Sequence, residues 1–153
     1  MIARHLAKTL KAAARSFPVV TVTGPRQSGK TTLVQAVFPR HRYVSLEDPE
    51  ARAFATEDPR GFLGQFRGSV ILDEAQRVPD LFSYIQVIVD DEDRPGRFVL
   101  SGSQNFLLLH RVTQSLAGRC AVHRLLPFSR AELSGRPIRD LAARGESLLT
   151  AVV

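Results

Sequence analysis

Eight residues near the start of the chain have the types and spacing of a phosphate-binding loop. Their order is Gly24-Pro25-Arg26-Gln27-Ser28-Gly29-Lys30-Thr31, which matches the pattern G-x-x-x-x-G-K-[ST]. The glycines allow the backbone to curl so that successive N–H groups face phosphate oxygens, and the following helix adds positive partial charge. Lys30 supplies a charge for the β- and γ-phosphates, and the Thr31 hydroxyl is placed to bind Mg²⁺. The loop therefore predicts a site for a nucleoside triphosphate.

A second set of candidate residues lies further along the chain, where an apolar run ends in acids. Val70-Ile71-Leu72 is followed by the two carboxylates of Asp73 and Glu74. On a strand beside the loop, Asp73 would hold the Mg²⁺ shell, and Glu74 would polarise a water for in-line attack on the γ-phosphate. The adjacent glutamate favours hydrolysis of the triphosphate over phosphoryl transfer to a small metabolite. The alternative is a strand that simply ends in acidic residues.

One polar turn and two arginines supply further candidates. The turn Ser101-Gly102-Ser103-Gln104-Asn105 follows an apolar run. Since ligands of α/β sheets bind at the carboxyl ends of strands, Ser103 or Gln104 would contact the γ-phosphate or the attacking water. Alternatively, this turn caps the next helix. Arg119 is either an arginine finger that acts in trans or a surface arginine, and Arg26 is a candidate for phosphate or partner contact.

These residues must be positioned by strands and helices that alternate along the chain. Five short apolar and β-branched runs predict strands at residues 18–23, 42–46, 69–72, 97–100 and 120–125. Helices are expected at residues 30–37, 49–56, 59–66 and 79–89, and the second and third of them start at an Asp-Pro pair. The first, third and fourth strand runs are mostly apolar, as in strands buried on both faces. The alternation predicts an α/β sandwich around a mostly parallel, five-stranded sheet.

The composition is that of one globular domain. The chain has 153 residues, of which 44% are apolar, and no apolar run approaches the ~18 residues of a membrane-spanning helix. Cys120 is the only cysteine, the four histidines lack metal-ligand spacing, and no G-x-S-x-G nucleophile pattern occurs. Since no continuous apolar segment follows the basic start, we expect a cytoplasmic protein that does not associate with membranes.

The charge is arranged in blocks. Residues 1–46 carry a net charge of +8, residues 47–93 carry −8 and residues 94–153 carry +6. The basic ends either steer a polyanion such as nucleic acid, or solvate the surface and assist the triphosphate site. No interleaving of arginine with aromatic residues supports a nucleic-acid platform. Residues 1–17 superficially resemble a transit peptide, but their apolar spacing favours a packed amphipathic helix, and the acidic run 90–93 predicts a solvated turn.

Six segments follow one another in a characteristic order. They are Gly24 to Leu33 (which includes Thr32), Tyr43 to Pro49, Leu72 to Gln76, Leu100 to Gln104, Ser115 to Arg119, and Leu126 to Ser129 with Glu132-Leu133. The ordered set resembles the AAA-type ATPase domain of bacterial and archaeal proteins that usually carry a second domain called DUF4143. The resemblance covers roughly residues 1–135. It implies a three-layer P-loop NTPase sandwich with sheet order 5-1-4-3-2.

The resemblance also implies roles for residues and a division of the chain. It implies ATP and Mg²⁺ as ligands, Lys30 and Thr31 at the phosphates and the metal, Asp73 and Glu74 in the Walker B role, and a sensor around Ser103. It assigns no settled role to Arg119. We expect a packed helix over residues 1–17, an ATPase core over 18–135 and a short helical tail over 136–153, truncated relative to the family because the second domain is missing.

Three hypotheses about function follow from the residues and the resemblance. The leading one is an ATP-hydrolysing domain that uses Mg²⁺. The second is a nucleotide-binding switch, or a truncated remnant, that binds ATP and turns over little. The third is a DNA-associated motor domain, which the basic ends of the chain suggest. The residues alone do not distinguish ATP from GTP, and they leave open whether the chain forms a homo-oligomer or binds a protein partner.

Overall fold

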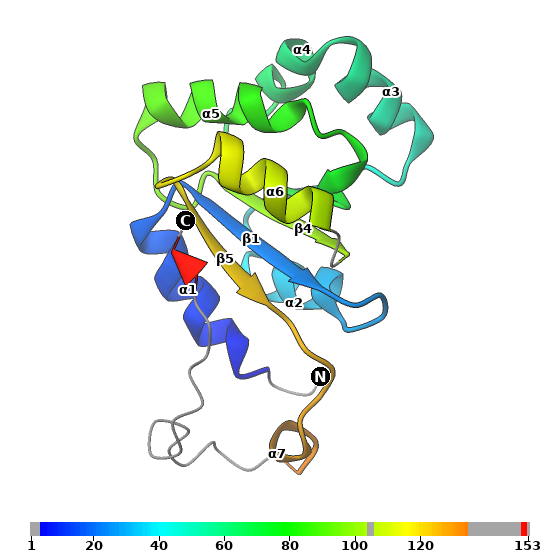
Figure 1. The fold of residues 1–153 in the computed structure, drawn as a ribbon, viewed down its shortest axis with the longest axis vertical. Helices are drawn as coiled ribbons and strands as arrows, with labels where there is room; N and C mark the ends of the chain where they lie inside the picture. The colour runs from blue at the N-terminus through cyan, green and yellow to red at the C-terminus, as the bar shows by residue number, and fades with distance from the viewer. Residues whose placement is uncertain (1–3, 104–105, 135–150, 153) are drawn as a thin grey trace.

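A six-stranded sheet lies at the centre of the structure, a computed structural model in which residues 4–103, 106–134 and 151–152 are described (Figure 1). The strands occur in the spatial order β2-β3-β4-β1-β5-β6. In chain order they are β1 (Val19–Gly24), β2 (Arg42–Ser45), β3 (Val70–Asp73), β4 (Phe98–Ser103), β5 (Cys120–Arg124) and β6 (Ala151–Val152). The first five strands are parallel to their neighbours, so the predicted order 5-1-4-3-2 is confirmed.

β1 and β3 are buried along their whole length, as their apolar runs predict. All six residues of β1 and all four of β3 are buried. This is the expected composition of parallel strands that helices cover on both faces. Because parallel strands align their carboxyl ends at one edge of the sheet, the segments that follow β1, β3 and β4 emerge together.

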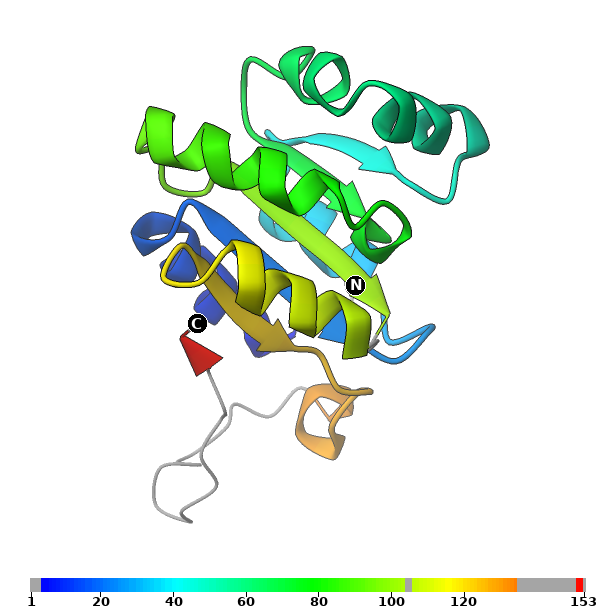
Figure 2. The same cartoon turned by 45° about the horizontal axis from the view of Figure 1, so that its top comes forward.

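Helices cover the two faces of the sheet, so the molecule has three layers (Figure 2). The helices are α1 (Leu6–Ser16), α2 (Lys30–Val37), α3 (Pro49–Glu57), α4 (Pro59–Gly64), α5 (Leu81–Glu92), α6 (Phe106–Ser115) and α7 (Arg130–Leu133), with a 3₁₀ turn, η1 (Ala75–Arg77). On one face, α1 and α2 pack on the sheet through Leu10, Leu33 and Val34. On the other, α4, α5 and α6 pack through residues such as Phe62, Phe82 and Val112. Among the described helices, none is long and apolar enough to cross a membrane.

The two helices predicted from Asp-Pro pairs start where those pairs place them. The Asp48 side chain accepts a hydrogen bond from the Glu50 N–H at 3.2 Å, and Asp58 accepts one from the Gly61 N–H at 2.9 Å. Each aspartate thereby satisfies an amide of the first helical turn that has no partner within the helix. The following proline costs no hydrogen bond, since its position would have no intrahelical N–H partner.

Two local expectations differ from the structure. The acidic run 90–93 is not a turn, because Asp90, Asp91 and Glu92 form the end of α5 and only Asp93 leaves the helix. The apolar stripe of α5 continues to the buried Val89, so packing extends the helix into the acidic residues. Most of the expected helical tail over 136–153 lies outside the described residues. Within it, residues 151–152 form β6, an antiparallel strand that pairs with the edge of β5, where unpaired backbone groups favour another strand.

Candidate functional site

The residues singled out in the sequence gather at the carboxyl edge of the sheet. The loop from Gly24 to Thr31 connects the end of β1 to the start of α2. Asp73 is the last residue of β3, and Ser103 is the last residue of β4. Since Gly24 pairs in register with Ser103, the loop starts beside the end of β4. The fold therefore brings the phosphate loop, the acidic strand end and the polar turn to one place.

The loop has a curled backbone that Gly29 and Gln27 make possible. Gly29 precedes α2 with φ = 84°, and Gln27 has φ = 61°. Residues in this left-handed region reverse the direction in which successive N–H groups point, which creates a concave row of donors. The α2 N-terminus adds its own free amides and positive partial charge at the same point. Together these features form a concavity whose N–H donors are suited to an anion.

Lys30 lies over the loop and not out in solvent. Its side chain is buried, and its ammonium group donates to the Gly24 carbonyl at 3.0 Å and to the Pro25 carbonyl at 2.7 Å. Both acceptors belong to the loop itself. These two hydrogen bonds hold the positive charge of Lys30 at the phosphate loop.

Gly24 is required by a close approach between the loop and the exit of β5. A Cβ atom added at Gly24 would lie 2.3 Å from the Leu125 carbonyl oxygen, far inside any normal contact. Leu125 is tied to the same place, because its N–H donates to the Thr23 carbonyl at 2.7 Å. Only glycine lets the start of the loop lie against this backbone.

Asp73 is the centre of a hydrogen-bond network. Its carboxylate is buried and accepts from the hydroxyl of Thr31 at 2.7 Å. Tyr43 donates to the same oxygen at 2.8 Å, and Ser101 donates to the other oxygen at 2.6 Å. The contact with Thr31 joins the phosphate loop to the acidic strand end. A carboxylate and a hydroxyl at this distance are hard oxygen donors of the kind Mg²⁺ prefers, so the pair fits that ion.

Tyr43 is a member of this network to which the sequence prediction gave no role. It lies on β2, whose register places it opposite Ile71 of β3. Burial, together with the hydrogen bond to Asp73, raises the pKa of Tyr43 to about 12. The phenol is therefore protonated at neutral pH and donates its proton to the Asp73 carboxylate. A phenol within a short strand beside the acidic strand is the signal that could have identified it.

Glu74 has an unusual backbone and a defined side-chain partner. Its φ of 53° and ψ of 43° lie in the left-handed region, directly before η1. The Gln76 amide donates to the Glu74 carboxylate and, at 3.1 Å, to the Ser103 hydroxyl. Gln76 thus connects the acidic strand end with the turn after β4. The sequence prediction placed Gln76 in a family segment but gave it no role.

The remaining predicted loop residues differ in their exposure. Ser28 is buried, whereas Pro25 and Thr31 are half-buried. The side chains of Arg26, Gln27 and Thr32 are exposed beside the concavity. Gln104 and Asn105, the alternative sensor and cap, lie outside the described residues.

The structure does not bring Arg119 to the phosphate loop. Arg119 precedes β5, and its carbonyl accepts from the Val19 N–H at the amino end of β1. Five strand residues, or about 16 Å, separate this end of the sheet from the loop. The guanidinium donates to both carboxylate oxygens of Asp90 on α5, and this hydrogen bonding lowers the pKa of Asp90. Any contact with a phosphate would have to be made in a second copy of the chain.

Comparison with known sequences identifies the domain type. Residues 16–134 match the model of a family described as AAA domain. The chain is also 38% identical over 143 residues to the uncharacterized proteins Rv2008c of Mycobacterium tuberculosis and Mb2031c of Mycobacterium bovis. Each match covers 92% of this chain but only 30% of the relative. The chain thus spans less than a third of the length of these curated relatives.

Solved structures share the fold at low identity. The Walker-type ATPase PABY2304 of Pyrococcus abyssi aligns with a TM-score of 0.58 at 18% identity, over 86% of this chain and 55% of that one. DnaA of Aquifex aeolicus, bound to AMPPCP, aligns with a TM-score of 0.56 at 18% identity, over 94% and 56%. Because the family model extends over most of the described core, the chain belongs to the AAA domain family, a nucleotide-binding domain of the P-loop ATPase type.

Proposed function

We propose that the chain hydrolyses ATP with the help of Mg²⁺ at the carboxyl edge of the sheet. The observation that supports this most directly is the hydrogen bond of 2.7 Å between the Thr31 hydroxyl and the Asp73 carboxylate. It joins a phosphate loop to an acidic strand end, with Glu74 next in the chain. A site for binding alone needs the loop, whereas hydrolysis also needs a general base beside it.

Binding of the triphosphate rests on the loop amides and on Lys30. The Lys30 ammonium group donates to two loop carbonyls, which are neutral acceptors. Phosphate oxygens are charged acceptors, and charge-assisted hydrogen bonds are roughly twice as strong as neutral ones. We therefore expect Lys30 to exchange a carbonyl partner for the β- and γ-phosphates when ATP binds.

The metal proposal rests on Thr31 and Asp73. Their oxygens are suited to Mg²⁺, and Tyr43 and Ser101 hold the Asp73 carboxylate from two sides. When bound, the ion would neutralise part of the charge on the transferred phosphoryl group. The remaining contribution of Tyr43 and Ser101 is to keep the carboxylate correctly oriented.

Glu74 is the proposed general base. It would accept a proton from the water that attacks the γ-phosphate, so that the products are ADP and inorganic phosphate. Gln76 donates to the Glu74 carboxylate and to Ser103 at the same time, which orients both groups. The Gln76 amide thereby links Ser103 to the proposed base. In this proposal, Arg119 would contribute only to the site of a neighbouring copy.

The contact between Glu74 and Gln76 also supports a second candidate function, a nucleotide-binding switch with little turnover. A carboxylate that is occupied by an amide must lose or share that hydrogen bond before it can activate water. In a switch, ATP would bind tightly and phosphate release would be slow. The cytoplasmic location, the missing DUF4143 domain, and a protein or nucleic-acid partner stay predictions.

Binding and turnover should be measured separately. ATP affinity is determined from the ligand-induced rise in unfolding temperature, because a ligand that binds only the native state stabilises it. Phosphate release is then measured with Mg²⁺-ATP for the wild type, Glu74→Gln and Lys30→Ala. We expect Glu74→Gln to bind ATP like the wild type and to lose 10²-fold or more in turnover, a typical contribution of a general base.

The outcomes separate the candidates. Lys30→Ala should weaken ATP binding, and it should also lower the unfolding temperature without ligand, because it removes a buried side chain and two hydrogen bonds to loop carbonyls. Equal phosphate release by the wild type and Glu74→Gln would refute hydrolysis at this site. Tight ATP binding without measurable release would favour the switch, and removal of Mg²⁺ with EDTA should stop any genuine turnover.

A further inference from the structure

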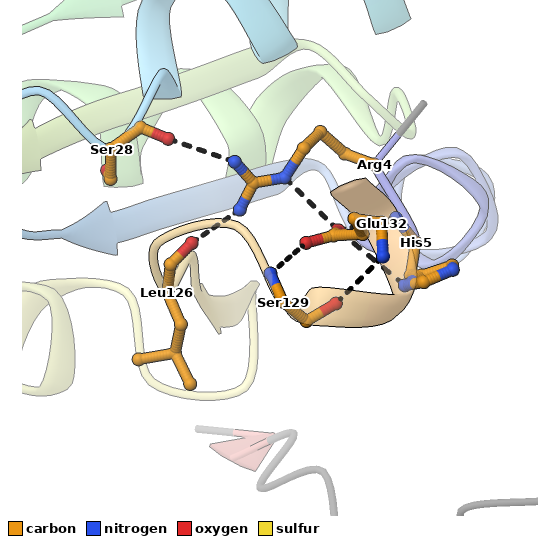
Figure 3. Close-up of polar contacts among 6 residues, drawn as sticks. All are labelled: Arg4, His5, Ser28, Leu126, Ser129 and Glu132. Atoms are coloured by element: carbon orange, nitrogen blue, oxygen red, sulfur yellow. Dashed lines mark hydrogen bonds and ion pairs between the residues drawn. The ribbon is translucent and has the colours of Figure 1, made fainter. Parts of the chain in front are cut away.

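One arginine joins the phosphate loop to two distant segments of the chain. Arg4 lies before α1, and its side chain is only 7% exposed. Its Nη1 group donates to the Ser28 carbonyl at 3.2 Å, and its Nη2 group donates to the Leu126 carbonyl beyond β5 (Figure 3). Its Nε group donates to Glu132 at 3.2 Å, and the guanidinium lies 4.1 Å from the centre of the Phe128 ring. The geometry of these contacts holds the guanidinium in one place.

Glu132 fixes the other side of this contact. Its carboxylate accepts from Arg4, from the His5 N–H at 3.1 Å and from the Ser129 N–H at 2.9 Å. In return, the Ser129 hydroxyl accepts a hydrogen bond from the Glu132 N–H, which completes a capping box at the start of α7. Burial alone would raise the pKa of Glu132, but the two amides and the Arg4 charge lower it below its usual value. The carboxylate is therefore ionised and fully hydrogen-bonded at neutral pH.

The carbonyl that Arg4 holds belongs to the peptide unit of the next residue, Gly29. In a planar, trans peptide the C=O of Ser28 and the N–H of Gly29 point in opposite directions. Because the Ser28 carbonyl points to Arg4, the Gly29 N–H points away from Arg4. Gly29 has a positive φ and no side chain, so its own conformational preferences restrain this peptide little.

We propose that Arg4, held by Glu132, is a positioning residue that orients the Gly29 N–H toward the phosphates of the bound nucleotide. The inference rests on the proposed nucleotide site and adds to it a contact from outside the phosphate loop. An amide that is oriented before binding need not be ordered during binding, so the nucleotide is bound more tightly. Replacing Arg4 should therefore weaken ATP binding even though Arg4 lies outside the loop.

Arg97 offers a matched control within the same chain. It is as buried as Arg4, donates to Glu92 at 2.8 Å and donates to the backbone carbonyls of Gly68 and Phe66. It also stacks on an aromatic ring, 4.6 Å from the centre of Phe98. Arg97 precedes β4, at the amino end of the sheet, far from the phosphate loop. Its replacement removes the same kinds of contact without touching the loop.

The experiment compares Arg4→Gln with Arg97→Gln. The dissociation constant of ATP is measured by titration calorimetry at a temperature where each variant is folded, and stability is measured by urea unfolding. We expect both variants to lose stability, but only Arg4→Gln to lose ATP affinity. Its dissociation constant should rise about tenfold or more, which is the change in affinity expected from the loss of one charge-assisted hydrogen bond. Arg4→Lys keeps the charge and part of the contact, so its affinity should lie between those of the wild type and Arg4→Gln.

A second pair serves if an arginine variant does not fold. Glu132→Gln and Glu92→Gln keep the shape of each carboxylate and remove its charge, and only Glu132→Gln should weaken ATP binding. Equal ATP affinities within either pair, with a wild type that binds ATP, would overturn the positioning role and leave the nucleotide site intact. Failure of the wild type to bind ATP would overturn the proposed function itself.

Discussion

The close approach at Gly24 predicts a large effect of a single methyl group. In Gly24→Ala, the new Cβ would lie 2.3 Å from the Leu125 carbonyl oxygen, whereas ordinary contacts begin at 3.4 Å. One backbone must therefore move by roughly 1 Å, which would stretch the 2.7 Å hydrogen bond from the Leu125 N–H beyond useful length. A lost backbone hydrogen bond costs about 1 kcal/mol and overpacking about 1–3 kcal/mol. We expect a loss of about 2–4 kcal/mol in the free energy of unfolding.

The assay is equilibrium unfolding in urea, in which the midpoint should fall while the slope stays constant. Gly64→Ala is the matched control, since a Cβ atom there meets nothing within 4 Å. Gly64 ends α4, so the control should be neutral or stabilising by about 0.5–1 kcal/mol. If Gly24→Ala unfolded at the same urea concentration as Gly64→Ala, the argument that the loop and the β5 exit are in obligatory contact would be wrong.

Three further predictions concern other residues. Gln76→Met keeps the side-chain length and removes both donated hydrogen bonds, so phosphate release should fall about tenfold with unchanged ATP affinity, and a rise would mean that Gln76 restrains Glu74. The pKa of Glu132 in the folded state lies below its ordinary value of 4.5. The ionised carboxylate therefore contributes its full stabilisation above pH 4.5, and this contribution is lost as the pH falls below the folded-state pKa. In urea unfolding, the stability of Glu132→Gln should decline less steeply than that of the wild type over this acidic range. Burial raises the pKa of the Cys120 thiol to about 12, so iodoacetamide at pH 8 should alkylate it only after unfolding, and rapid labelling of the native chain would contradict its burial.

The parts of the structure that local patterns determine were predictable from the sequence. The apolar run of β1 and the pattern of the phosphate loop place Lys30 and Thr31 at the start of a helix, where the structure has them. The strand order 5-1-4-3-2 came from the resemblance and not from the residues. Once that order is given, Thr31 and Asp73 are expected at the same edge of the sheet, because Thr31 follows the loop after β1 and Asp73 ends the parallel strand β3.

The contacts that the sequence did not predict join residues that are distant in the sequence. Gln76 meets Ser103 only because Glu74 turns into the left-handed region and starts η1, which no residue pattern indicated. Arg4 contacts Ser28 and Glu132 across wide separations in sequence, and one arginine among eighteen gives no signal of its own. Arg119 illustrates the opposite case. Its position in the sequence suggested a contact with a phosphate, but in the structure its guanidinium binds Asp90, away from the phosphate loop.

The backbone at Glu74 has a consequence for how this domain can change over time. A residue with a side chain costs roughly 1 kcal/mol or more in the left-handed region, whereas glycine adopts it freely. Glu74→Gly would therefore relieve strain and remove the proposed base in one substitution. The position is one at which selection for a more stable fold and selection for chemistry oppose each other. A descendant that no longer needed turnover could become a more robust nucleotide-binding protein by this single exchange.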